Sequence, residues 1–293
     1  MNWQQLAQQI SDATGQVFEV ISTHSISGGC INTAYQIKGQ QCSYFVKLNR
    51  GDLLSMFEAE FAGLEAMQHS HSVRIPTPIS TGLLDEQSFL LTEMIQLQSC
   101  RSDCNRKLGE QLAKMHQQPQ PYFGWHRDNT IGATEQVNDQ SDDWVSFWRQ
   151  QRLGFQLDLA ASKGYRGRLE QSGQQLCQRL DNFFTDYQPQ PALLHGDLWS
   201  GNAEADSEGN PVIFDPACYY GDREADIAMT ELFGGFGADF FDAYNDHYPL
   251  DSGYKVRKTL YNLYHILNHL NLFGSGYQRQ AQGMIDQLLA EIR

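Results

Sequence analysis

The chain has 293 residues, enough to bury a large core in one domain or two smaller ones. Its 35 acidic and 21 basic residues give a formal net charge of −14. That charge argues against a nucleic-acid or anionic-membrane surface and is compatible with cationic small substrates. No apolar run approaches the roughly 20 residues that cross a bilayer, and the N-terminus lacks a signal peptide's basic and apolar regions, so we expect a cytoplasmic protein.

The first hundred residues predict a small sheet with one inserted helix. An amphipathic opening helix places Trp3, Leu6 and Ile10 at helical spacing. Five short segments rich in β-branched, aromatic or other apolar residues then predict strands, and one segment with 3.6-residue periodicity predicts a helix. The expected strands are 17–22, 34–39, 43–49, 78–84 and 88–95, and the expected helix covers 54–67.

From about residue 103 the pattern becomes helical, with long amphipathic segments such as WVSFWRQQRLGFQLDLAAS and TLYNLYHILNHLNLF. A polar stretch between these helical blocks carries two short apolar runs, at 191–194 and 212–214. We therefore predict an α+β protein with two lobes, a five-stranded β lobe at 1–95 and a larger, mainly helical lobe at 96–293. Six cysteines (30, 42, 100, 104, 177, 218) are scattered along the chain, which predicts reduced thiols and no zinc site.

Three features of the β lobe together suggest phosphate chemistry. HSISGGCINTAYQI (24–37) places Gly28, Gly29 and Cys30 between two strands, where bare backbone amides can approach phosphate oxygens. Lys47 lies within the apolar strand YFVKLN, and Glu60 follows on the helix, where it can hold the lysine in place. Each feature alone is commonly a turn or a surface charge, but phosphoryl transfer uses this order of parts.

The segment HGDLWSGN separates Asp197 from Asn202 by four residues, as in the catalytic loop of protein kinases. There the aspartate accepts the proton of the substrate hydroxyl and the asparagine holds magnesium. Asp215 follows a short apolar strand in VIFDPA, where a second magnesium ligand is expected. We therefore predict Asp197 as the catalytic base and Asn202 with Asp215 as ligands of Mg²⁺, with ATP as the phosphoryl donor.

Over nearly its whole length the sequence resembles the fructosamine/ketosamine-3-kinases, relatives of aminoglycoside and choline kinases. The resemblance lies in GGCIN, FEAE, WVSFWRQQRLGFQLDLA, LLHGDLWSGN and FDPACYYGDREADIAMTELFGGF. It implies a protein-kinase-like fold and ATP-dependent phosphorylation of the sugar 3-hydroxyl of ketoamines, which contributes to deglycation. It also implies redox control through Cys30, by a disulfide between the nucleotide loops of two copies, so that the protein is a monomer or a redox-linked homodimer.

The remaining assignments concern the joint between the lobes and the acceptor side. We expect adenine to meet backbone groups of Glu93, Met94 and Ile95, where the fifth strand enters the joint. Trp199 and His195, on the same loop as Asp197, are expected on the substrate side, with Trp199 either an apolar wall for the substrate or a lobe-packing residue. Further candidates for the acceptor site are three aromatics that could cover a sugar and three acids that could attract an amine: Trp148, Tyr219, Phe236, Asp222, Glu224 and Asp226. For Asp226 the alternative is a cap or a pair within a helix.

Two other functions stay open from the sequence. One is a kinase for an aminoglycoside, choline or another amino-bearing alcohol, and the other is a kinase-like binding module without turnover. The set of Lys47, Glu60, Asp197, Asn202 and Asp215 argues against the module, since each expected catalytic part is present.

Overall fold

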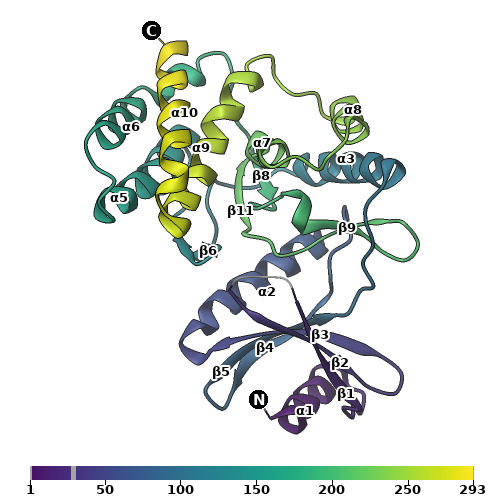
Figure 1. Cartoon of the computed structure of the whole chain (residues 1–293). Coiled ribbons are helices and arrows are strands. Elements are labelled where there is room, and N and C mark those ends of the chain that lie inside the picture. Colours follow the sequence, from purple (N-terminus) through teal and green to yellow (C-terminus); the bar gives the residue numbers. More distant parts are fainter. Residues whose placement is uncertain (1, 28–30, 293) are drawn as a thin grey trace.

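The computed structural model describes residues 2–27 and 31–292, and Figure 1 shows a sheet-containing part below a mostly helical part. The sheet is antiparallel, with five strands in the order β1-β2-β3-β5-β4. Its strands are β1 (Ser22–Ile26), β2 (Thr33–Lys38), β3 (Ser43–Arg50), β4 (Pro78–Leu84) and β5 (Gln87–Glu93). The predicted α+β class and the five-stranded sheet are therefore confirmed.

The two faces of this sheet are covered by different helices, α1 (Trp3–Thr14) and α2 (Leu54–His69). Alternation along β3 sends Val46 and Leu48 into the small core that α1 completes. Lys47, between them, points to the opposite face, where α2 lies between the sheet and the helical part (Figure 1). Because apolar side chains of α2 belong to the main core, this helix joins the two parts.

The helical part contains eight α-helices within the described residues and three short strand pairs. The helices are α3 (Ser102–His116), α4 (Trp144–Phe147), α5 (Phe155–Ser162), α6 (Arg168–Gln178), α7 (Glu224–Leu232), α8 (Ala238–His247), α9 (Tyr254–Phe273) and α10 (Gln278–Glu291). The strand pairs are β6 (Asn129–Ile131) with β7 (Thr134–Gln136), β8 (Pro191–Leu194) with β11 (Tyr219–Asp222), and β9 (Ala203–Ala205) with β10 (Pro211–Ile213). None of the helices described is long and apolar enough to span a membrane.

The first strand does not lie where the sequence predicted it. Residues 17–21 connect α1 to the sheet and only Ser22 of the predicted strand lies in β1, with Val17 91% exposed and Ile21 59% exposed. Phe18 is buried in the small core, and the Ile21 N–H donates to the Lys38 carbonyl at 2.8 Å. The actual β1 has the polar sequence STHSI, which an edge strand tolerates because one face of it meets water.

The segment 144–162, predicted as a long helix, is helical throughout but changes its winding. Between α4 and α5, residues Trp148–Gly154 form a π-helical turn around the buried Arg152. The Arg152 guanidinium donates to the Val137 carbonyl and to Asn138, each at 2.6 Å, and lies over the ring of Tyr219. The wider turn therefore accompanies a buried cation whose partners come from another part of the chain.

Two of the six cysteines contradict the prediction of reduced thiols. Cys100 and Cys104 form a disulfide, with their Cα atoms 5.3 Å apart. The start of α3 at Ser102 brings the two residues within the ordinary span of a disulfide, which sequence spacing alone did not indicate. Cys42, Cys177 and Cys218 are free, and within residues 2–27 and 31–292 no group of three or more His, Cys, Asp or Glu side chains could hold a metal ion.

The joint between the two parts runs from the end of β5 at Glu93 to the start of α3 at Ser102. Along it, Gln98 exchanges backbone hydrogen bonds with Ala205 of β9, each at 2.8 Å. The lobe boundary at residue 95 stays a prediction.

Candidate active site

Lys47 lies between two carboxylates. Its Nζ atom is 2.6 Å from Oε1 of Glu60 on α2 and 2.7 Å from Oδ1 of Asp215, which follows β10. The structure therefore pairs Lys47 with Glu60, as the sequence predicted. Burial alone would lower the pKa of Lys47, but the two carboxylates outweigh burial and raise that pKa, so the ammonium stays charged at neutral pH.

The loop that follows β8 is fixed by a buried acid of α7. The backbone N–H groups of His195 and Gly196 donate to the carboxylate of Asp226 at 2.7 and 2.8 Å. Gly196 has a φ of +81°, and a Cβ there would lie 2.1 Å from the Ala217 carbonyl oxygen, so only glycine fits. His116 of α3 holds the same carboxylate at 3.2 Å. Asp226 thus positions the loop that presents Asp197.

Asp197 and Asn202, both on this loop, contact each other beside a cavity. The Asn202 side-chain amide donates to the Asp197 carbonyl at 2.9 Å and to its carboxylate Oδ2 at 3.3 Å. Burial, followed by the negative charge of Asp215, raises the pKa of Asp197 to about 7. A raised pKa makes this carboxylate a stronger proton acceptor than an ordinary surface aspartate.

Asp215 adopts a left-handed backbone conformation with a φ of +58°, which costs energy for a residue other than glycine. Its side chain is 49% exposed and borders the same cavity as Asn202. The Asn202 amide nitrogen is already used by Asp197, which leaves the amide oxygen as a ligand. Two hard oxygen donors beside a cavity fit Mg²⁺, which takes few protein ligands and completes its shell with phosphate and water.

These side chains line one cavity of about 220 Å³ between the two parts of the molecule. Lys47, Glu60, Asp197, Asn202 and Asp215 all border it. Trp199 lies at its rim, 39% exposed, which is compatible with an apolar wall rather than a packed lobe contact. The five residues that the sequence selected are therefore gathered around a single space.

Two groups of predicted nucleotide-binding residues stay predictions. Gly28, Gly29 and Cys30 lie outside the described residues. At the joint, the Glu93 N–H already donates to the Thr77 carbonyl at 2.9 Å, and the Glu93 carboxylate pairs with Arg74 at 2.7 Å. Met94 and Ile95 follow the strand and make no backbone hydrogen bond within the part of the chain described, which leaves them free to meet an adenine edge.

His195 was expected on the substrate side, and the structure contradicts this. The side chain is fully buried, and its Nε2 atom lies 2.9 Å from the Phe214 carbonyl oxygen. Burial lowers the pKa of His195, so the imidazole is neutral and donates to that carbonyl. His195 therefore links its loop to the segment before Asp215 instead of facing a substrate.

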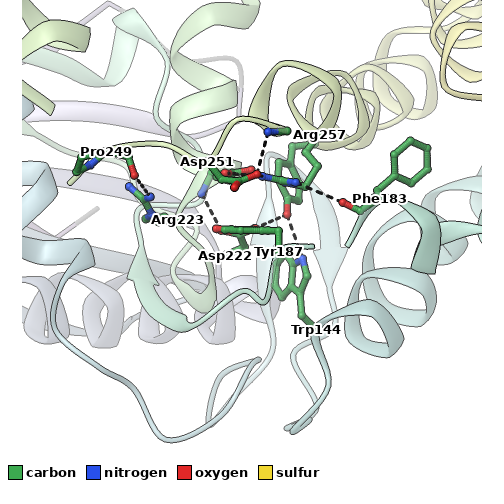
Figure 2. A network of polar contacts seen from close by, with 11 residues as sticks. Trp144, Phe183, Tyr187, Asp222, Arg223, Pro249, Asp251 and Arg257 are labelled. Atoms are coloured by element: carbon green, nitrogen blue, oxygen red, sulfur yellow. Dashed lines mark hydrogen bonds and ion pairs between the residues drawn. The ribbon is translucent and has the colours of Figure 1, made fainter. Parts of the chain in front are cut away.

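The acids expected to attract an amine are also buried. Asp222 accepts a hydrogen bond from Tyr187 (Figure 2) and another from Tyr261. Glu224 forms an ion pair with Arg257 at 2.7 Å. Asp222 and Glu224 are 0% exposed, and Asp226 holds the loop described above. Their partners come from distant elements, so they serve the fold of the helical part and not the acceptor.

The three aromatic side chains expected to cover the sugar do not lie at the acceptor site either. Trp148 and Tyr219 are buried, and Tyr219 covers the Arg152 guanidinium. Phe236 packs against Phe240, with ring centroids 5.0 Å apart. None of the three borders the cavity that contains Asp197.

His265 of α9 is a buried histidine that the sequence analysis did not select. Burial, with the neighbouring His269 as second cause, lowers the pKa of His265 to about 3. The unfolded chain binds a proton at this residue below its ordinary pKa of about 6.5, whereas the folded protein does not. Stability contributed by neutral His265 is therefore present above pH 6.5 and lost as the pH falls toward 3.

We accordingly expect acidification to weaken the wild type more than His265→Gln. Between pH 6 and pH 5 the free energy of unfolding should fall by about 1 kcal/mol more in the wild type, since one proton distinguishes the two states. Urea unfolding of both proteins at the two pH values measures this difference. Equal losses would show that His265 is protonated in the folded state.

The fold and the gathered residues define a phosphotransferase of the protein-kinase-like fold. Aminoglycoside phosphotransferase APH(4)-Ia superimposes with a TM-score of 0.65 at 15% identity, covering 98% of this chain and 97% of the other, and shows the fold alone. The chain belongs to the fructosamine kinase family, whose model matches residues 2–291. The resemblance noted in the sequence is thus confirmed.

Individual relatives agree with this family. The chain is 48% identical to a "probable ketoamine kinase" of Synechocystis sp. over 288 residues, covering 98% of this chain and 97% of the relative. It is 42% identical to the chloroplastic protein-ribulosamine 3-kinase of Arabidopsis thaliana over 282 residues, covering 95% of this chain and 86% of the relative. The crystal structure of a "putative fructosamine-3-kinase" from Haemophilus somnus 129PT has a TM-score of 0.90 at 29% identity, covering 98% of this chain and 97% of that one.

Proposed function

We propose that this protein transfers the γ-phosphoryl group of ATP to the sugar 3-hydroxyl of ketosamines, the fructosamine and ribulosamine adducts of amines, and so contributes to deglycation. The observation that carries the proposal is the single cavity bordered by Lys47, Glu60, Asp197, Asn202 and Asp215. Its supports are family membership and relatives named as ketoamine and protein-ribulosamine kinases. The aminoglycoside-type alternative rests on likeness of fold alone.

Each residue has a distinct part in this reaction. Lys47, held by Glu60, would bind the α- and β-phosphates. Asn202 and Asp215 would hold Mg²⁺, which neutralises phosphate charge. Asp197 would orient the acceptor hydroxyl and take its proton while the oxygen bonds to phosphorus and ADP departs.

Trp199 would form an apolar wall on the acceptor side, since it borders the cavity and remains partly exposed. Gly28, Gly29 and Cys30 would contact phosphates, and adenine would meet the backbone near Met94 and Ile95. We also propose a cytoplasmic location and a monomer or a dimer linked through Cys30. These parts of the proposal rest on the sequence.

The experiment that tests the function supplies ATP, Mg²⁺ and the ribulosamine of a protected lysine to the purified protein. We expect one ADP for each phosphorylated acceptor, and phosphorus NMR of the product should show the phosphate coupled to the proton on carbon 3. ADP formation that does not rise above the rate without acceptor would favour the binding module. A phosphate on another carbon would contradict the assigned position.

A further inference from the structure

A second cavity of about 320 Å³ adjoins the one described above. The two cavities share four described lining residues, Ile31, Gly132, Asp197 and Trp199, so the carboxylate of Asp197 lies between them. The second volume lies in the range of small-ligand sites. Lys47 and Glu60 border the first cavity and not the second, so a molecule in the second cavity would reach Asp197 without displacing them.

A continuous series of aromatic rings lines this second cavity. From Trp199 the series continues through Phe233 and His269 to Phe273, with neighbouring ring centroids 6.4, 5.1 and 5.4 Å apart. Trp199, Phe233 and Phe273 are 39%, 45% and 62% exposed. Large aromatic side chains left exposed together, beginning at a catalytic loop, are typical of a binding surface.

The charges around the second cavity favour a cationic occupant. Of its lining side chains that are described, Asp197 is the single acid, and none is a lysine or arginine. His265 also borders it, 5% exposed, and its ring makes no hydrogen bond with any residue that the structure describes. Because its pKa is lowered to about 3, this imidazole is neutral and does not repel a cation.

We propose that the second cavity holds the amine half of the ketoamine acceptor, an inference that rests on the proposed function. The secondary amine of a ketoamine is protonated at neutral pH, as alkylamines are, and its cation would lie against the rings of Phe233 and Phe273. The alkyl stem would leave past Phe273, the most exposed ring of the series. The unpartnered His265 ring offers a hydrogen-bonding group to the same occupant.

The test compares the wild type with a Phe233→Leu/Phe273→Leu double variant, which keeps apolar bulk and removes both rings. The acceptor is the ketoamine of Nα-acetyl-lysine. Its ether analogue, with oxygen in place of the amine nitrogen, lacks the cation at that atom and serves as a competing alternative acceptor. We expect KM for the ketoamine to rise about tenfold in the variant, or about 1.4 kcal/mol, with kcat changed less than twofold. KM for the ether should change less than twofold.

Phe233→Tyr/Phe273→Tyr is the matched control, since it keeps both rings and should keep the wild-type KM. Mg·ATP affinity should be equal in all three proteins, which checks their folding. An unchanged ketoamine KM in the leucine variant, or an equal loss for amine and ether, would overturn the amine subsite alone. A wild-type protein that phosphorylates no ketoamine would overturn the proposed function and this inference with it.

Discussion

Asp197→Asn is expected to lower kcat by about 100- to 10,000-fold, the range that general-base assistance contributes. Asparagine has nearly the same size and can still accept a hydrogen bond, but it cannot take the acceptor's proton. Lys47 pairs with Glu60 and Asp215 and not with Asp197, so the substitution should leave the nucleotide-binding residues in place. We therefore expect Mg·ATP to bind the variant with wild-type affinity in a calorimetric titration.

The negative charge of Asp215 contributes to the raised pKa of Asp197, so the neutral variant should also relieve this repulsion. For this reason the loss of turnover should not be accompanied by a loss of stability. Asp186→Asn, at an exposed position before β8, is a suitable control and should keep full activity. Turnover of a ketoamine by Asp197→Asn at close to the wild-type rate would remove Asp197 from the catalytic role.

The sequence predicted those parts of the site that depend on short spacing. Asn202 is five residues from Asp197 on one loop, so the chain itself keeps the two side chains in contact. Lys47 could be placed on the face of the sheet opposite Val46 and Leu48 because side chains alternate along a strand. The helix that follows this strand then carries Glu60 across that face.

The errors concern buried polar groups whose partners lie far away in sequence. Asp222 and Glu224 were expected to attract an amine, yet Tyr187 and Arg257 satisfy them inside the protein (Figure 2). Asp226 was considered for an amine, but its partners are His116 and the backbone of the catalytic loop. Spacing along the chain does not reveal such pairs, since burial of a charge depends on which distant group neutralises it.

One signal in the sequence could have located the second cavity. His265, His269 and Phe273 recur at four-residue intervals on α9, so they share one face of this helix. Two histidines on the same face as an exposed phenylalanine indicate that this face is not fully packed in the core. The first strand was misplaced because the apolar segment 17–22, of which Val17 and Ile21 are exposed, mostly precedes the sheet, whereas the polar STHSI forms the sheet edge.

We expect a large difference in catalytic efficiency between two classes of acceptor, because the structure favours ketoamines over aminoglycosides. An aminoglycoside carries several ammonium groups, whereas the described lining of the second cavity offers one carboxylate, that of Asp197. Asp222, Glu224 and Asp226, which could have bound further ammonium groups, are buried and already paired. A ketoamine with one amine therefore matches this lining better.

Competition kinetics with a lysine ribulosamine and an aminoglycoside as simultaneous acceptors tests the central claim most directly. We predict that kcat/KM for the ribulosamine exceeds that for the aminoglycoside at least about 100-fold. This ratio corresponds to about 2.7 kcal/mol of differential transition-state binding, which one or two well-placed polar contacts can supply. Equal values, or a preference for the aminoglycoside, would contradict the assignment of this protein as a ketosamine kinase.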